Sequence, residues 1–160
     1  SILDLIYDNR NDLAQPIADI CHEWVQNNNQ VVRDNATGRK FIKFRSNKLR
    51  TFFKDVDAKH YYYQIDIRPE ERNQVVKVQI ALVFYKDVNE ILSPDIKRMM
   101  QVVIEKGTKS NKSSDFNQWK TVASYIQKFT VGYDKDFEEQ DKVISFINNS
   151  FESIEKMIPD

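Results

Sequence analysis

The sequence predicts a single α+β domain over residues 1–160, in which helices pack on one face of an antiparallel sheet of three or four strands. Alternating apolar residues mark two long strands joined by a short polar link. Apolar residues at helical spacing mark an N-terminal helix and a long C-terminal amphipathic helix. With 160 residues, 41% of them hydrophobic, the chain is large enough to bury one core.

The first helix is expected to begin near Asn11 or Asp12, because both side chains can cap the exposed N–H groups of a helix N-terminus. The run of three asparagines at 27–29 is expected to end it, and residues 35–38 are typical of a turn. Four apolar residues between these limits share one helix face: Leu13, Ile17, Ile20 and Trp24.

The two clearest strands cover residues 61–68 and 76–85, where apolar and other residues alternate with a period of two. The polar link 69–74 is short enough for an antiparallel hairpin. Val83 and Tyr85 make the far end of the second strand apolar on both faces. We therefore expect another group to cover the outer face there.

A further strand is expected over residues 39–45, with Ile42 and Phe44 on one face and Phe41, Lys43 and Arg45 on the other. The segment that follows, 48–56, suits a short helix capped by Ser46.

Two more helices have clear limits. Ser93 and Pro94 are a cap and a first helical residue, and that helix is expected to run to Lys106, with Gly107 just past its end. The last helix is expected over 137–158, behind the acidic residues Asp134, Asp136, Glu138 and Glu139, which suit the positive end of its dipole.

Residues 119–131 fit two patterns. Phe116, Trp119, Ala123 and Ile126 have helical spacing, whereas the β-branched and aromatic residues of the same segment are typical of a strand. We favour the strand.

Histidine, cysteine and glycine are scarce, which limits the available chemistry. Cys21, His22 and His60 cannot form a four-ligand zinc site without carboxylates. The three glycines lie far apart, which excludes a phosphate-cradling loop and a dinucleotide-binding fingerprint. We expect no cofactor and no metal, and an enzyme is the less favoured class.

Charge and cysteine content bear on location. Lys+Arg and Asp+Glu number 24 each, so no global charge draws the chain to DNA or to a membrane. No apolar run approaches the roughly 20 residues that span a bilayer, so we expect no membrane partner. A lone Cys21 excludes an internal disulfide and favours a reducing compartment, so a cytoplasmic location is expected.

The stretch 39–54 is the strongest functional hint, because it carries seven positive charges and no negative one. In a functional interpretation, five of these residues bind DNA or RNA phosphates: Lys40, Lys43, Arg45, Lys48 and Arg50. Tyr62, Arg68 and Lys77 would then add a base-stacking platform on the outer sheet face. In a structural interpretation, the charges face water or the acidic turn 134–141, as mixed surface charge commonly does.

Two other functions stay open. A metal-dependent nuclease could use Asp57 and Lys59, which have the acid–x–Lys form, with Asp34 or Asp66 as a further acid. A small-ligand-binding domain could use a tyrosine-lined pocket built from Tyr61, Tyr62, Tyr63 and Tyr85.

The segments 61–68, 75–85 and 137–158, together with Trp119, resemble a bacterial family of uncharacterised domains. Those domains often lie at the C-terminus of proteins that also carry a restriction-endonuclease-like region. The resemblance implies a bacterial setting near DNA processing or defence, and it transfers no catalytic residue. The leading hypothesis is a non-catalytic module that binds nucleic acid, a partner protein or a fused domain.

Overall fold

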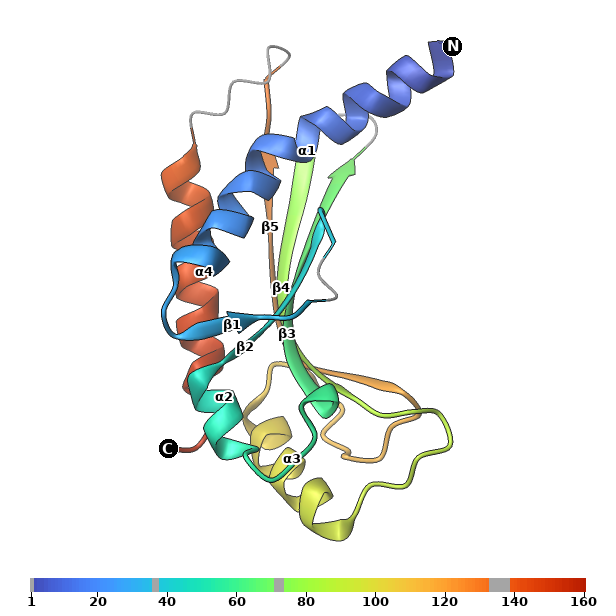
Figure 1. The fold of residues 1–160 in the computed structure, drawn as a ribbon, viewed down its shortest axis with the longest axis vertical. Helices are drawn as coiled ribbons and strands as arrows, with labels where there is room; N and C mark the ends of the chain where they lie inside the picture. The colour runs from blue at the N-terminus through green and yellow to red at the C-terminus, as the bar shows by residue number, and fades with distance from the viewer. Residues whose placement is uncertain (1, 36–37, 71–73, 133–138) are drawn as a thin grey trace.

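The computed structural model describes residues 2–35, 38–70, 74–132 and 139–160, with side chains described from Leu13 onward. Its centre is one antiparallel sheet of five strands that neighbour each other in chain order (Figure 1). The strands are β1 (Val31–Arg33), β2 (Phe41–Ser46), β3 (Tyr61–Glu70), β4 (Val75–Tyr85) and β5 (Trp119–Thr130). The α+β class and the antiparallel sheet are confirmed, and the number of strands, predicted as three or four, is five.

The additional strand is β1, which pairs with β2 through Val31 opposite Ser46. It has three residues, and Val32 is exposed. Three residues are too few to show a period of two, so β1 forms because β2 offers it a partner and not because of its own pattern.

The prediction of a strand at 119–131 is confirmed as β5, and the structure explains why its pattern was mixed. Leu82 pairs with Ala123, but Val83 pairs with Thr121, so Val122 is an extra residue in a β-bulge. A bulge shifts the alternation of side chains by one position. The residues on either side of Val122 therefore do not follow a single period of two.

The helices are α1 (Ile2–Asn27), α2 (Asn47–Phe52), α3 (Pro94–Lys106) and α4 (Gln140–Glu155), with a short 3-10 turn, η1 (Ala58–His60). The expected start of α1 near Asn11 or Asp12 is wrong, since the helix begins at Ile2. A capping residue allows a helix to start but does not prevent it from continuing, because Asn and Asp cost under about 1 kcal/mol inside a helix.

The last helix ends close to the predicted limit, and Ile154 and Ile158 are buried as expected. Its predicted beginning at Phe137, with the acidic residues Asp134, Asp136 and Glu138, lies outside the described residues.

Both capping predictions are confirmed. The Leu49 N–H donates to Ser46 Oγ at 3.0 Å, and the Ile96 N–H donates to Ser93 Oγ at 3.2 Å. The helix that Ser93 caps ends at Lys106, and the next residue, Gly107, lies very close to β5. A Cβ atom added to Gly107 would lie 2.2 Å from the Val122 carbonyl oxygen. Glycine is therefore required at this close approach.

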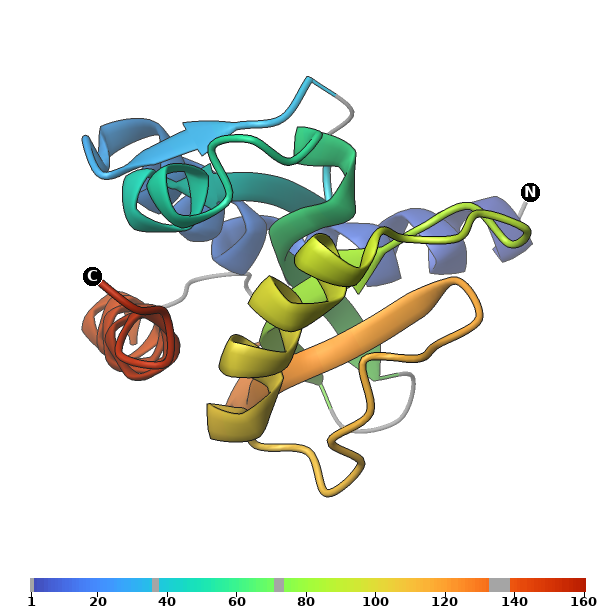
Figure 2. The same cartoon turned by 90° about the horizontal axis from the view of Figure 1, so that it is seen from below.

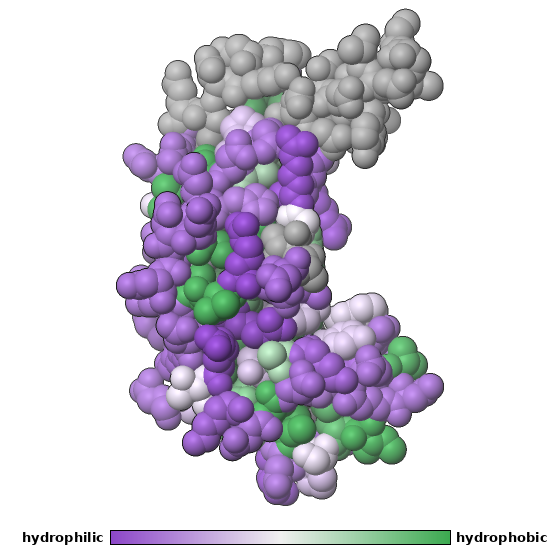
Figure 3. All heavy atoms as spheres, viewed as in Figure 1, coloured by the Kyte–Doolittle hydropathy of each residue, from purple (hydrophilic) through white to green (hydrophobic). Residues whose placement is uncertain are grey.

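Helices α1 and α4 lie side by side over one face of the sheet (Figure 1), and α3 lies across one end of it (Figure 2). The core between these layers contains Phe44 stacked on Tyr63, with ring centroids 5.0 Å apart. Figure 3 shows this helix-bearing side, which is mainly hydrophilic, with apolar side chains visible over α1 and α4 and toward the end that carries α3.

A half-buried carboxylate ties α4 to the sheet. Glu155 Oε2 accepts hydrogen bonds from Tyr63 Oη at 2.7 Å and from Ser46 Oγ at 2.8 Å. Burial, and then the neighbouring charge of Glu155, raise the pKa of Tyr63 well above its ordinary value. The phenol therefore remains a donor to the carboxylate.

Candidate binding surface

The second face of the sheet is formed by the residues that alternate with the core residues of β2–β5. The described helices direct their buried apolar side chains into the core on the opposite face. The apolar cluster on this second face contains strand residues alone: Tyr62, Ala81, Val83 and Tyr85. We call this side of the molecule the outward face.

One end of the outward face holds a hollow of about 380 Å³, here called the aromatic hollow. Trp119 at its rim is 60% exposed, and its ring lies 5.9 Å from that of Tyr85. The Lys43 ammonium lies over the ring of Tyr62, 4.3 Å from its centroid. Seven residues line the hollow: Phe41, Lys43, Tyr62, Gln64, Val83, Trp119 and Thr121.

The aromatic hollow also explains how the apolar end of β4 is covered. Val83 is 3% exposed although no described helix contributes to its cluster. Tyr62 lies directly opposite Val83 on β3, and Thr121 lies opposite it on β5. Val83 is therefore covered by neighbouring side chains of the outward face, which are the covering group that the sequence led us to expect.

Burial is the main cause of the pKa shifts of Tyr62 and Asp66 on this face. It raises the pKa of Tyr62, and it raises the pKa of Asp66 against the opposing effects of Arg68, Gln64 and Lys77. Gln64 Nε2 donates to Asp66 Oδ2 at 3.0 Å.

The other end of the outward face carries a row of cations. Arg68 stands opposite Lys77 across β3 and β4, and Lys77 stands opposite Lys128 across β4 and β5. Lys128 also forms an ion pair with Glu70 at 3.0 Å. Like charges directly opposite one another destabilise a sheet, and the acids Asp66 and Glu70 offset part of this repulsion.

A second hollow, here called the basic hollow, lies beside α2 and has a volume of about 660 Å³. Arg50 and Lys54 supply its charge, and Tyr61 supplies an aromatic wall. Its lining residues are Asn47, Arg50, Thr51, Lys54, Val56, Ala58 and Tyr61. It therefore combines two cations with the amide and hydroxyl donors that suit a phosphate.

The eight residues predicted to bind nucleic acid do not form one patch. Lys43 and Tyr62 line the aromatic hollow, Arg50 lines the basic hollow, and Arg68 and Lys77 form the distant row. Lys40 immediately precedes β2, and its carbonyl oxygen accepts from the Ile67 N–H at 2.9 Å.

Arg45 and Lys48 make polar contacts to other parts of the chain. Arg45 pairs with Asp34 at 2.9 Å and donates to the carbonyl oxygens of Ala58 and Tyr61. Lys48 points to the C-terminal helix, where its ammonium donates to the Glu155 carbonyl oxygen at 2.9 Å and pairs with Asp160 at 3.2 Å. The structure thus gives both residues structural partners.

Asp57 and Lys59, the residues of the nuclease alternative, have local partners. Asp57 Oδ1 accepts from the Lys59 N–H and so caps η1, while the Lys59 ammonium lies 3.4 Å from Asp87 and 3.7 Å from Glu90. Among the side chains that the structure describes, from Leu13 onward and outside residues 36–37, 71–73 and 133–138, no group of three Cys, His, Asp or Glu is placed to hold a metal ion.

Cysteine and histidine also have separate environments. Cys21 is buried in the core, and burial raises the pKa of its thiol to about 12. His22 contacts the Arg39 carbonyl oxygen through Nε2 at 2.7 Å. His60 is buried, with Nδ1 2.8 Å from the Tyr85 carbonyl oxygen and Nε2 3.4 Å from Glu90.

The predicted tyrosine cluster is divided between the two faces. Tyr63 is fully buried in the core, and Tyr61 stacks on Phe53 with ring centroids 4.9 Å apart. Tyr62 and Tyr85 belong to the outward cluster. The four residues therefore do not line one pocket.

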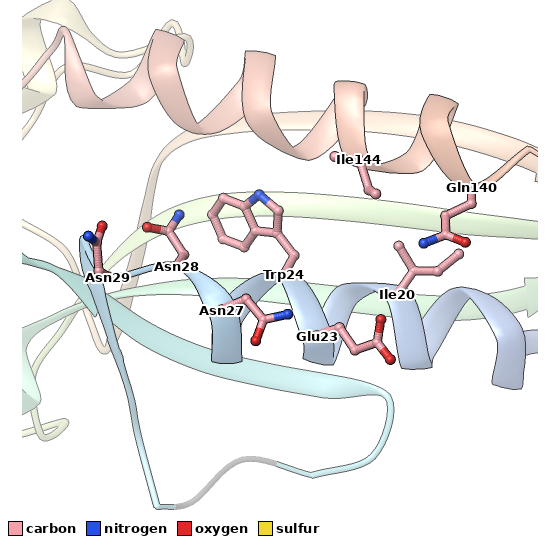
Figure 4. A pocket seen from close by; sticks show the side chains of 8 residues that line it. All are labelled: Ile20, Glu23, Trp24, Asn27, Asn28, Asn29, Gln140 and Ile144. Carbon is pink, nitrogen blue, oxygen red and sulfur yellow. The ribbon is translucent and has the colours of Figure 1, made fainter.

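A third hollow, of about 540 Å³, lies between α1 and α4 (Figure 4). Trp24 lies between the two helices and donates from Nε1 to Asn148 Oδ1 at 2.7 Å. The rest of the lining is Ile20, Glu23, Asn27, Asn28, Asn29, Gln140 and Ile144. This lining has a carboxylate and no cation, so it does not suit an anionic ligand.

Trp119, Gln64, Thr121 and Lys128 were absent from the predicted site. A strand at 119–131 was expected, but the bulge at Val122 concealed which of its residues face outward. Gln64 gave a usable signal, because it lies two residues from Tyr62 on the same side of a clear strand.

No helix within the described part of the chain is both long and apolar enough to cross a membrane. Comparisons with family models, with curated proteins and with solved structures found no match to this chain. The resemblance to the bacterial domain family therefore stays a prediction.

Proposed function

We propose that this chain is a non-catalytic module that binds single-stranded nucleic acid on the outward face. The observation that carries the proposal is the aromatic hollow, in which an exposed Trp119 stands beside a lysine and two further aromatic residues. Stacking on exposed aromatic side chains next to cations is the usual way in which proteins hold unpaired bases.

The hollow suits a base in both size and chemistry. Its volume of about 380 Å³ lies within the range of ligand pockets, and its walls are mostly apolar with a few polar groups. The rim position of Trp119 leaves a ring surface for stacking, whereas Tyr62 is 4% exposed and lies under Lys43. Trp119 is therefore the stacking residue, and Tyr62 forms the floor.

One cationic region of the outward face supports phosphate binding. The row at its far end contains Arg68, Lys77 and Lys128. Phosphate contacts of this kind supply affinity without sequence preference. The resemblance to domains found with restriction-endonuclease-like regions agrees with a role near DNA.

Fluorescence anisotropy with a labelled single-stranded oligonucleotide of about 12 nucleotides tests the proposal. We expect binding at low salt, with an affinity that falls as salt rises, by a slope of about −0.7 for each phosphate contacted. Trp119→Ala is expected to weaken binding by roughly tenfold, since one base stack is worth about 1–3 kcal/mol.

Charge variants locate the phosphates. Lys43→Glu and the pair Lys77→Glu with Lys128→Glu are each expected to weaken binding and reduce the salt slope. Lys106→Glu on α3 is the matched control, because it makes the same charge change at an exposed residue away from both hollows. If the folded chain binds neither single-stranded DNA nor single-stranded RNA at low salt, the proposal is wrong.

A further inference from the structure

The basic hollow beside α2 carries two cations without a partner inside the fold. Arg50 and Lys54 both line it, and both side chains are exposed. Within the part of the chain that the structure describes, neither side chain forms an ion pair or a hydrogen bond. Arg45 and Lys48, from the same basic stretch, are each paired with an acid. The charge of Arg50 and Lys54 is therefore available to a ligand in the hollow.

The hollow has two walls of different chemistry. Asn47, Arg50, Thr51 and Lys54 follow at the spacing of neighbours on one helix face, with Lys54 in the turn just after α2. These residues form a wall of cations and hydrogen-bonding groups. The other wall is mainly apolar and consists of Val56, Ala58 and Tyr61.

Tyr61 adds a hydroxyl that has no hydrogen-bond partner among the described residues, although the residue is only 4% exposed. A polar group removed from water is normally hydrogen-bonded, and a ligand in the hollow that Tyr61 lines could accept this bond. Burial raises the pKa of Tyr61, while the charges of Arg45 and Arg50 oppose the shift and that of Asp57 adds to it. The phenol therefore keeps its proton at neutral pH.

The acid near this phenol does not close the hollow to an anion. Asp57 lies outside the lining, and its Oδ1 accepts from the Lys59 N–H and so caps η1. The lining itself contains two cations and no carboxylate. A ligand with two negative charges therefore matches the hollow better than a neutral or a cationic one.

We infer that the basic hollow binds a phosphate monoester in its dianionic form. Arg50 and Lys54 match the two charges, and the hydroxyls of Tyr61 and Thr51 can donate to phosphate oxygens. The volume of about 660 Å³ leaves room beyond the phosphate, and the apolar wall suits the organic group that the phosphate carries. Tyr61 belongs to the helix-bearing side of the sheet, so this site is separate from the outward face. The inference does not depend on the proposed function.

An NMR chemical-shift titration of the ¹⁵N-labelled chain with phenyl phosphate tests the inference. We expect saturable shifts of amides in α2 and η1. Arg50→Gln should weaken binding roughly tenfold, because it removes a charged donor. Tyr61→Phe keeps the ring and removes only the hydroxyl, and it should weaken binding roughly fivefold. Arg98→Gln, the same change at an exposed residue of α3, is the matched control and should bind as the wild type does.

The charge of the ligand gives an independent readout. The second pKa of a phosphate monoester is about 6, so phenyl phosphate should bind more weakly as pH falls from about 7.5 to about 5. Phenyl sulfate has a similar shape and a single charge throughout this range. It should bind weakly at both pH values, and it controls for titration of the protein, including that of His60 on η1.

A phosphate monoester occurs on small molecules and at the 5′ end of a nucleic-acid strand, and competition separates these sources. A 5′-phosphorylated oligonucleotide that displaces phenyl phosphate better than its 5′-hydroxyl form would identify the strand end. Equal displacement would identify a small molecule.

The inference is wrong if about 10 mM phenyl phosphate causes no saturable shifts in the wild type. It is also wrong if Arg50→Gln and Tyr61→Phe both bind as tightly as the wild type. Either result leaves the proposed function on the outward face untouched. Conversely, a chain that binds phenyl phosphate and no single-stranded nucleic acid would contradict the proposed function alone.

Discussion

Phe44 and Phe41 lie three residues apart on β2, and their surroundings show how the two faces of the sheet differ. Phe44 is fully buried and contacts the rings of Trp24, Tyr63 and Phe151. Phe41 is half-buried at the wall of the aromatic hollow, where Lys43 lies 5.9 Å from its ring centroid. One face joins the sheet to the helices, and the other presents aromatic and charged groups to solvent.

We expect this difference to separate stability from the proposed binding. The helix-bearing face gains its stability from apolar burial and from the Glu155 hydrogen bonds. The outward face keeps one small apolar cluster under exposed polar and aromatic side chains. Substitutions on the first face should therefore change the free energy of unfolding, and substitutions on the second should mainly change binding.

The largest expected effect is that of Phe44→Ala, which should lower the free energy of unfolding by about 3–5 kcal/mol. The loss arises from the removed burial and from the cavity left among three neighbouring rings. Urea denaturation measures it. Phe41→Ala is the matched control on the same strand and should cost less than about 1.5 kcal/mol. Equal losses at the two positions would contradict the division between the faces.

Glu155→Ala should lower the free energy of unfolding by about 2 kcal/mol, because it leaves the buried hydroxyls of Tyr63 and Ser46 without their acceptor. Thermal unfolding measures the change. In the Tyr63→Phe background the same substitution should cost less, because one of the two stranded donors is absent. Additive losses would mean that the Tyr63–Glu155 bond contributes nothing to stability.

Alkaline pH should weaken the helix-bearing face through Cys21. The pKa of its thiol is about 12 in the folded protein against an ordinary value of 9.0, so its contribution is complete below pH 9.0 and is lost as pH rises toward 12. Between about pH 8 and about pH 10, the wild type should lose roughly 1.4 kcal/mol more than Cys21→Ala. Urea denaturation measures the free energy of unfolding at each pH. If it falls equally in the wild type and in Cys21→Ala, the pKa of the Cys21 thiol is not raised by folding.

The smallest expected effect on stability is that of Trp119→Ala on the outward face. Trp119 is 60% exposed, so its removal should change the free energy of unfolding by about 0.5 kcal/mol or less. The same variant should bind single-stranded nucleic acid roughly tenfold more weakly. A large loss of stability would mean that Trp119 is a packing residue.

Much of the fold was predictable because its patterns are local. The hairpin of β3 and β4 has long, regular alternation, and Ser46 and Ser93 cap their helices through groups three residues away. The start of α1 and the strand β1 were not predictable. The first depends on how far a helix continues past a possible cap, and the second depends on the partner strand β2.

The candidate binding surface was less predictable, because sequence proximity does not fix which way a charge points. Seven cations within residues 39–54 suggested one patch. Lys48 lies in α2, and its ammonium donates to the carbonyl oxygen of Glu155 in the C-terminal helix. Arg45 forms an ion pair with Asp34. Lys43 and Arg50 remain beside hollows, and Trp119 joins Lys43 from a strand far away in the chain.

By itself, the sequence determined the α+β class, the alternating strands and the caps, because these follow from side-chain periodicity and from hydrogen bonds within a few residues. The tertiary structure decided which residues meet on the outward face. Pairing of five strands, with a bulge at Val122, brings Lys43, Gln64 and Trp119 to one hollow. The pairing of β2 and β5 with the hairpin of β3 and β4, and the bulge at Val122, depend on contacts between segments far apart in the chain, which no pattern within one segment records.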